Sequence, residues 1–188
     1  ISNLLEYTPN FILSRAMPLA DINTPLPVVN GPTIAVFDMT AFRRSFYCLI
    51  GQTSEYYTES NVVEFWKMVI KAAREAGITV MIKRKRRLGR QYQTDTFQKK
   101  LKRLYSETVI EIDENVAAES LIDHCDGVVS IPFTSTSVIG LDREKPSVYF
   151  DSTGRLNKPL SMDHGVPVLA DFQKLKIWME DLVVQKKR

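Results

Sequence analysis

The sequence predicts an α/β fold in which an open parallel β-sheet carries helices on both faces. From residue 33 onward, short apolar runs alternate with amphipathic stretches, and the connections between them are short. The apolar runs are continuous rather than alternating, which is typical of parallel strands buried on both sides. With 188 residues, of which 44% are hydrophobic, the chain can bury the core of one such domain.

Five strands are expected, and amphipathic stretches separate them. The strands are expected at residues 33–38, 78–82, 108–112, 127–131 and 147–150. Helices are expected near 61–76, 94–105, 115–124 and 135–142, and a further one at 171–184. An alternation of this kind, wound by right-handed crossovers, produces a Rossmann-like sheet.

The helix expected near 61–76 has the clearest pattern. Ser60 is a suitable N-cap, and Gly77 stands where a left-handed residue is favoured at a helix end. The apolar stripe consists of Val62, Phe65, Trp66, Val69, Ile70 and Ala73. This spacing predicts one buried face.

Residues 1–32 do not show the alternation. Prolines interrupt any long element there, at Pro9, Pro18, Pro25, Pro27 and Pro32. We expect an irregular arm or an interdomain linker at 1–32, followed by a single domain at 33–188. Because the chain begins within ordinary globular sequence without an initiator Met, we expect a fragment of a larger two-domain protein.

Composition excludes several classes of protein. The chain has 25 Lys and Arg against 22 Asp and Glu, a net charge of +3. With its apolar content, this excludes a disordered tail, a collagen and a disulfide-stapled mini-protein. The two cysteines, Cys48 and Cys125, suit a reducing compartment. Because no apolar run approaches the roughly 20 residues that span a bilayer, we expect a cytoplasmic location.

Motifs of the common cofactor enzymes are missing from the sequence. The chain has no Walker loop, no glycine fingerprint after the first strand and no metal-ligand cluster. The sequence therefore argues against a dehydrogenase or an NTPase, and we expect neither a metal nor a cofactor. Asp38 follows the first strand, as the nucleophile of haloacid-dehalogenase phosphatases does, but Thr40 stands where that chemistry needs a second acid.

Four consecutive hydroxyl residues open a helix at the end of the fourth expected strand. Ligands of open parallel sheets bind beyond the carboxyl ends of the strands. A helix N-terminus offers unpaired N–H groups and a positive dipole end there, and hydroxyls add donors to phosphate oxygens. We therefore expect a phosphate or carboxylate site at Thr134, Ser135, Thr136 and Ser137. An N-cap box with spare hydroxyls is the alternative.

Residues 83–90 contain six cations and follow the second expected strand. They form a solvated loop, a nucleic-acid patch, or a source of one or two cations for a phosphate in the crevice. Strand alternation sends Lys83 and Lys85 to one side, and Arg84 and Arg86 to the other. Because a nucleic-acid reader normally adds exposed aromatic side chains or a known module, we expect no nucleic-acid partner.

An acidic turn, Asp151-Ser-Thr-Gly154, follows the fifth expected strand. An acid with small neighbours at a crevice edge is suited to bind sugar or ribose hydroxyls. An ordinary strand-ending turn is the alternative.

Six segments together carry a family resemblance. They are Ile34-Ala-Val-Phe-Asp-Met-Thr40, Ser54-Glu-Tyr-Tyr57, 61–65, Ile82-Lys-Arg-Lys-Arg86, Asp126-Gly-Val-Val-Ser-Ile-Pro-Phe-Thr-Ser-Thr-Ser137 and Lys145-Pro-Ser-Val-Tyr-Phe-Asp151. They resemble bacterial surface-polysaccharide biosynthesis proteins of the capsule or O-antigen (lipopolysaccharide) type. Those proteins are similar to the C-terminal Rossmann-like domain of GT-B glycosyltransferases. The resemblance covers about residues 33–155, and 126–154 is its most specific part.

The resemblance implies that a nucleotide sugar is the substrate. It assigns the donor phosphates to Thr134, Ser135, Thr136 and Ser137, with Lys83 and Lys85 as cationic partners and Asp151 as a hydroxyl contact. A polysaccharide or lipid-linked glycan acceptor is then expected on a missing N-terminal domain. The basic residues 186–188 suggest peripheral contact with the inner face of the cell membrane, and a solvated terminus is the alternative.

The sequence also departs from the GT-B pattern. Many retaining enzymes of that fold have a Glu-x7-Glu motif, whereas the helix after Ser137 offers only Asp142 and Glu144. Two alternatives stay open: a domain like that of a non-hydrolysing sugar-nucleotide epimerase, and a non-catalytic module that binds anions or nucleic acid through 83–90.

Overall fold

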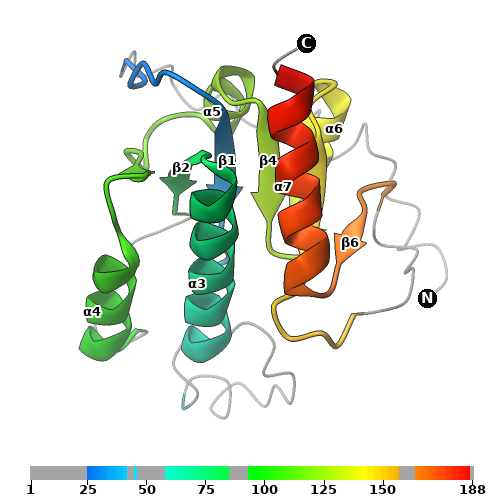
Figure 1. The fold of residues 1–188 in the computed structure, drawn as a ribbon. Coiled ribbons are helices and arrows are strands. Elements are labelled where there is room, and N and C mark those ends of the chain that lie inside the picture. Colours follow the sequence, from blue (N-terminus) through cyan, green and yellow to red (C-terminus); the bar gives the residue numbers. More distant parts are fainter. Residues whose placement is uncertain (1–24, 42–44, 46–57, 85–92, 157–163, 187–188) are drawn as a thin grey trace, which may run out of the picture.

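The described part of the chain forms one all-parallel sheet. We analysed a computed structural model, which describes residues 25–41, 45, 58–84, 93–156 and 164–186 (Figure 1). Within these residues the sheet has six strands in the order β3-β2-β1-β4-β5-β6. The strands are β1 (Thr33–Phe37), β2 (Thr79–Lys83), β3 (Val109–Glu111), β4 (Gly127–Ser130), β5 (Ser147–Phe150) and β6 (Val168–Leu169). The expected Rossmann-like α/β fold is confirmed.

Helices cover both faces of the sheet, as predicted (Figure 1). One face carries α3 (Glu59–Ala76), α4 (Asp95–Leu104) and α7 (Phe172–Lys186), and the other carries α5 (Ala118–His124) and α6 (Ser135–Asp142). The central strand β1 explains the two layers. Ile34 and Val36 face the core under α3, whereas Ala35 and Phe37 face the core under α5 and α6. Successive strand residues point to opposite faces, so a strand that is apolar throughout supplies both cores.

The structure of α3 follows the sequence pattern closely. All six residues of its predicted stripe are buried: Val62, Phe65, Trp66, Val69, Ile70 and Ala73. Gly77 ends the helix in the left-handed conformation, with φ +71°. The N-cap prediction was wrong by two residues, because the helix begins at Glu59 and Thr58 Oγ1 accepts the Asn61 N–H at 3.4 Å. Ser60 lies inside the first turn instead.

Strand β6 was not expected from the sequence. Val168 and Leu169 pair in parallel with Tyr149 and Phe150 of β5. A strand of two residues directly after Pro167 is too short to show any periodicity. With this sixth strand, the order matches that of dinucleotide-binding Rossmann sheets. The winding direction reverses between β1 and β4, which lie side by side.

Lys186, at the end of α7, bonds to residues just before β1 and β4. Its Nζ donates to Asp126 Oδ2 at 2.7 Å and to the Gly31 carbonyl at 2.8 Å. The same carboxylate oxygen accepts the Thr33 N–H at 2.8 Å. Burial alone would raise the pKa of Asp126, but the Lys186 and Thr33 donors outweigh it, so the pKa is lowered. Residues 25–32 of the arm expected at 1–32 lead into β1 here, and the rest of that arm, 1–24, lies outside the described residues.

Among the helices of the described residues, none combines the length and apolar composition needed to cross a bilayer.

Candidate functional site

The candidate site lies at the carboxyl edge of the sheet, beside the switch point between β1 and β4. Three segments meet there: the turn from β4 into α6, the turn after β5 and the first turn of α3. Tyr149 Oη of β5 donates to the Thr134 carbonyl at 2.9 Å, and Ser152 Oγ contacts the Asn61 carbonyl at 3.5 Å. These contacts join segments that are far apart in the sequence.

The hydroxyls of the β4–α6 turn form one directional chain. Ser137 Oγ donates to the Val148 carbonyl at 3.0 Å, which uses its only proton. In its 2.6 Å contact with Ser137, Ser130 must therefore be the donor. Thr134 donates inward, to Ser130 Oγ at 2.8 Å or the Ile131 carbonyl at 3.0 Å. Thr136 is then the donor in its 3.3 Å contact with Thr134.

This order divides the four predicted hydroxyls into two pairs. Thr134 and Ser137 hold the turn together, and Ser137 is fully buried. Ser135 is exposed, and Thr136 is half-buried with only the long contact to Thr134. Ser135 and Thr136 are therefore the two hydroxyls of the turn that can donate to a ligand at little cost.

The start of α6 is open. Thr134 occupies the N-cap position but makes no side-chain capping bond, because its hydroxyl is turned back to Ser130 and Ile131. Within the described residues, no side chain takes over that role, so the N–H groups of the first turn are available. Phe133, just before, has φ +64°, a conformation that is strained for a bulky residue. Its ring packs at 6.0 Å on that of Tyr149.

Gly140 fixes the height of α6 above the sheet. A Cβ at this position would lie 2.7 Å from Val128 Cγ2 and closer still to Ser147 Oγ. Only glycine permits so close an approach of helix and strands. The C-terminal half of α6 is thereby held against β4 and β5.

The two described cations of the basic run point to different places, as the alternation predicted. Lys83 Nζ donates to the Glu114 carbonyl at 3.0 Å, on the side of the β3–α5 loop. Burial lowers the pKa of Lys83 despite the carboxylates of Glu114 and Asp113. Arg84 turns toward α4, with its guanidinium 5.7 Å from the ring centre of Phe97. Lys85 and the rest of the run lie outside the described residues.

Arg84 belongs to a buried polar network that the sequence did not indicate. Its Nε lies 3.7 Å from Asp38 Oδ2, and its Nη1 donates to Gln98 Oε1 at 2.9 Å. Gln98 donates in turn to Gln93 Oε1 at 2.7 Å, and Gln93 Nε2 donates to the Ala41 carbonyl at 2.8 Å. The network binds the end of β1 to the end of β2 and to α4. Glutamines carry no spacing signal, so only the buried Asp38 could have suggested it.

Asp151 organises the turn after β5. Its Oδ1 accepts the Thr153 N–H at 2.9 Å and the Thr153 hydroxyl at 2.6 Å, and its Oδ2 accepts the Leu156 N–H at 2.6 Å. The residue is fully buried. These are the contacts of the strand-ending turn, and the role of Asp151 toward a sugar hydroxyl stays a prediction.

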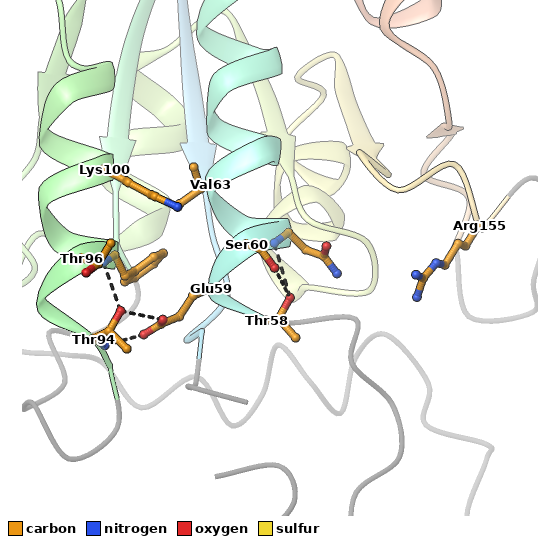
Figure 2. A pocket seen from close by; sticks show the side chains of 10 residues that line it. Thr58, Glu59, Ser60, Val63, Thr94, Thr96, Lys100 and Arg155 are labelled. Carbon is orange, nitrogen blue, oxygen red and sulfur yellow. Dashed lines mark hydrogen bonds between the residues drawn. The ribbon is translucent and has the colours of Figure 1, made fainter. Parts of the chain in front are cut away.

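A cleft of about 310 Å³ opens at the same edge (Figure 2). Its walls come from the first turns of α3 and α4 and from the turn after β5. Glu59 Oε1 and Oε2 accept the Thr94 N–H at 2.5 Å and the Thr94 hydroxyl at 2.8 Å, which locks the two helix starts together. Lys100 and Arg155 also line the cleft. The sequence reasoning missed this site, because its residues come from three separate segments.

Metal binding has no evident site in this part of the chain. Over the described ranges, no group of three or more His, Cys, Asp or Glu side chains is placed to hold an ion.

Comparison with protein-family models gave one relevant result. The model described as "Polysaccharide biosynthesis PFTS motif protein" matches residues 12–179. The letters PFTS occur in this sequence as Pro132-Phe133-Thr134-Ser135, which lead from β4 into the first residue of α6 and are called the PFTS turn below. Comparisons with curated proteins and with solved structures gave no significant match. The expected link to polysaccharide biosynthesis is confirmed, since the matched model covers most of the sequence: this chain belongs to the PFTS-motif family of polysaccharide biosynthesis proteins.

Proposed function

We propose that this chain is the nucleotide-sugar-binding domain of a glycosyltransferase that builds a surface polysaccharide. One observation carries the proposal: the PFTS turn lies at the carboxyl end of β4, at the switch point, and leads into the uncapped start of α6. Ligands of Rossmann-like sheets bind at such points, and helix starts favour phosphate.

In this proposal the phosphates of the donor lie against the first turn of α6. The free N–H groups of that turn and the hydroxyls of Ser135 and Thr136 donate to the phosphate oxygens. Thr134 and Ser137 act indirectly, since their inward bonds hold the turn in shape. Lys83 Nζ already donates to the Glu114 carbonyl. In this proposal, Lys83 and Asp151 therefore contribute less to binding of the nucleotide sugar than the first turn of α6 does.

The chemistry that this arrangement supports is stabilisation of a leaving group. In glycosyl transfer, the bond between the sugar and its nucleotide phosphate breaks, and the phosphate takes the electron pair. Donors already aimed at that phosphate stabilise the developing charge without reorganising. In the proposal, the first turn of α6 supplies this binding and orientation.

Thermal denaturation with nucleotide sugars tests the proposal. Melting of the chain is followed with UDP-, GDP-, CDP- and CMP-linked sugars at about 0.05 M and about 0.5 M salt. A ligand at about 100 times its Kd stabilises the folded state by about 2.7 kcal/mol, so one class of donor should raise Tm by about 5 °C or more. A site with specific hydrogen bonds should keep most of this shift at high salt.

Paired variants localise the site. S135A/T136A should abolish the shift and leave the melting of the free protein nearly unchanged. Ser106 and Thr108 offer a matched control, because their hydroxyls form a similar exposed pair, 3.1 Å apart, at the start of β3 on the opposite edge of the sheet. S106A/T108A should retain the full shift. Absence of a shift with every nucleotide sugar would refute the proposal.

A further inference from the structure

Two cationic side chains without an ion-pair partner among the described residues line the cleft beside α3. Lys100 approaches it from α4, with its ammonium group toward Val63, and Arg155 approaches from the turn after β5 (Figure 2). Neither the Lys100 ammonium nor the Arg155 guanidinium has a hydrogen-bond or ion-pair partner among the residues that the structure describes. Both side chains are exposed and can therefore reorient toward a ligand.

The charge balance of the lining favours an anion. The cleft has one carboxylate, that of Glu59, against the two cations. This carboxylate is already bonded to the N–H and hydroxyl of Thr94. One positive charge therefore remains for a ligand.

The rest of the lining suits a hydroxylated ligand. Ser60 and Thr96 contribute hydroxyls, and Asn61 contributes an amide that both donates and accepts. Val63 and Phe97 supply apolar surface, which suits the C–H faces of a sugar ring. The volume, about 310 Å³, is at the lower end of the range for small-molecule sites, about 300–1,000 Å³.

The two helix starts that border the cleft are already capped. The Asn61 N–H is bonded to Thr58 Oγ1 and the Phe97 N–H to Thr94 Oγ1, so the starts of α3 and α4 are capped. The recognition elements of the cleft are thus its side chains. This separates it from the open start of α6, since no residue of the PFTS turn lines it.

We propose that the cleft binds an acidic saccharide, with Lys100 and Arg155 contacting its carboxylate or phosphate groups and Ser60, Asn61 and Thr96 contacting its hydroxyls. Asn61 also borders a small cavity lined by Ile131, Ser152 and Thr153, at the foot of the PFTS turn. A saccharide in the cleft therefore lies next to the site of the proposed donor. The proposal stands without nucleotide binding, because the two sites share no recognition residue.

Titration of the 188-residue chain with defined saccharides tests this inference. Binding of trigalacturonate, glucose 1-phosphate, maltotriose and inorganic phosphate is measured by isothermal calorimetry at about 0.05 M salt. At least one of the two acidic saccharides should bind about tenfold more tightly than maltotriose and than inorganic phosphate. Which one does so distinguishes a carboxylate from a phosphate on the natural ligand.

Three variants decide whether the cleft is responsible. K100A and R155A should each weaken binding of the acidic saccharide by about tenfold, since each removes a charge-assisted contact. K99A is the matched control: Lys99 precedes Lys100 on the exposed surface of α4 and does not line the cleft, so its affinity should stay within about twofold of the parent.

Several results would overturn the inference. They are equal affinity for maltotriose and the acids, equal affinity for inorganic phosphate, no binding of either acid, or unchanged affinity in K100A and R155A. S135A/T136A should bind the acidic saccharide normally; loss in that variant would place the ligand at the PFTS turn instead. Failure of this inference is thus distinguishable from failure of nucleotide-sugar binding.

Discussion

Arg84 and Asp38 form a buried ion pair where the chain leaves the two strands β2 and β1. The Nε and Oδ2 atoms are 3.7 Å apart, and the two side chains are only 8% and 4% exposed. Arg84 Nε has no hydrogen-bond partner in the described part of the chain, so the nearby carboxylate is its main compensation. Arg84, one of the six cations at 83–90, thus stabilises the fold.

Removal of this carboxylate should strongly destabilise the protein. Asp38→Ala leaves the Arg84 charge buried beside an apolar group, which typically costs about 3–5 kcal/mol. The free energy of unfolding is measured by urea denaturation. Asp123→Ala is the comparison, because it removes a carboxylate from an exposed pair with Arg143 and should cost about 0–1 kcal/mol. A small effect of Asp38→Ala would mean that water reaches Arg84.

The hydroxyl chain of the PFTS turn predicts opposite behaviour for neighbouring serines. Ser137→Ala deprives the buried Val148 carbonyl and Ser130 hydroxyl of a partner, and should lower the free energy of unfolding by about 1–3 kcal/mol. Ser135→Ala removes an exposed hydroxyl and should change stability by less than about 0.5 kcal/mol. Urea denaturation of both variants is the measurement. Equal losses of stability would contradict the division of the turn into a structural Ser137 and an exposed Ser135.

The sequence predicted where the four hydroxyls lie but could not separate their roles. Four consecutive Ser and Thr residues at a helix start look equivalent in one dimension. Their roles depend on the Val148 carbonyl of the neighbouring strand, which accepts the Ser137 hydroxyl as a donor and thereby sets the direction of the other bonds. Strand pairing is a long-range property, and no local pattern encodes it.

Cys125 should make stability fall at alkaline pH. Burial raises the pKa of its thiol to about 12, whereas the pKa of a thiol in an unfolded chain is about 8.5. Between these values only the unfolded state loses the proton. The free energy of unfolding should therefore be fully retained below about pH 8.5 and fall by about 1.4 kcal/mol per pH unit above it.

Other groups also titrate in this pH range, so the contribution of Cys125 is measured as the difference between two variants in the free energy of unfolding. Urea denaturation from about pH 8 to about pH 10.5 is compared between Cys48→Ser and the double variant Cys48→Ser/Cys125→Ala. The double variant should lack this part of the slope. In the same Cys48→Ser background, a thiol reagent should label Cys125, which is 1% exposed, only after unfolding. Parallel pH profiles, or rapid labelling of the native state, would contradict the prediction.

Gly140→Ala should destabilise the domain through a steric clash. The new methyl group would lie 2.7 Å from Val128 Cγ2 and would also overlap Ser147 Oγ, forcing α6 away from the sheet. Overpacking of this kind costs about 1–3 kcal/mol, measurable as a lower Tm. Adding Ser147→Ala removes one of the two overlaps and should recover part of the loss. A neutral Gly140→Ala would mean that α6 is not seated as closely as described.

Periodicity explains which parts of the fold were predictable. The stripe of α3 and the continuous apolar residues of β1 report directly on burial, and both agree with the structure. The N-cap of α3 was misplaced because Thr58 and Ser60 are equally suitable hydroxyl residues, and only tertiary contacts select between them. The ion pair and the cleft join residues that are remote in sequence, such as Asp38 with Arg84 and Lys100 with Arg155.

The position of α7 bears on how the protein folds during synthesis. This helix buries Leu175, Met179 and Leu182 in the same core as α3, more than 95 residues earlier in the chain. A nascent chain that has completed β5 therefore still exposes the apolar side of α3 that α7 covers in the folded protein. That side of α3 can be covered only after residues 172–186 have left the ribosome. Truncation of this segment should therefore leave apolar surface exposed and make the chain prone to aggregation.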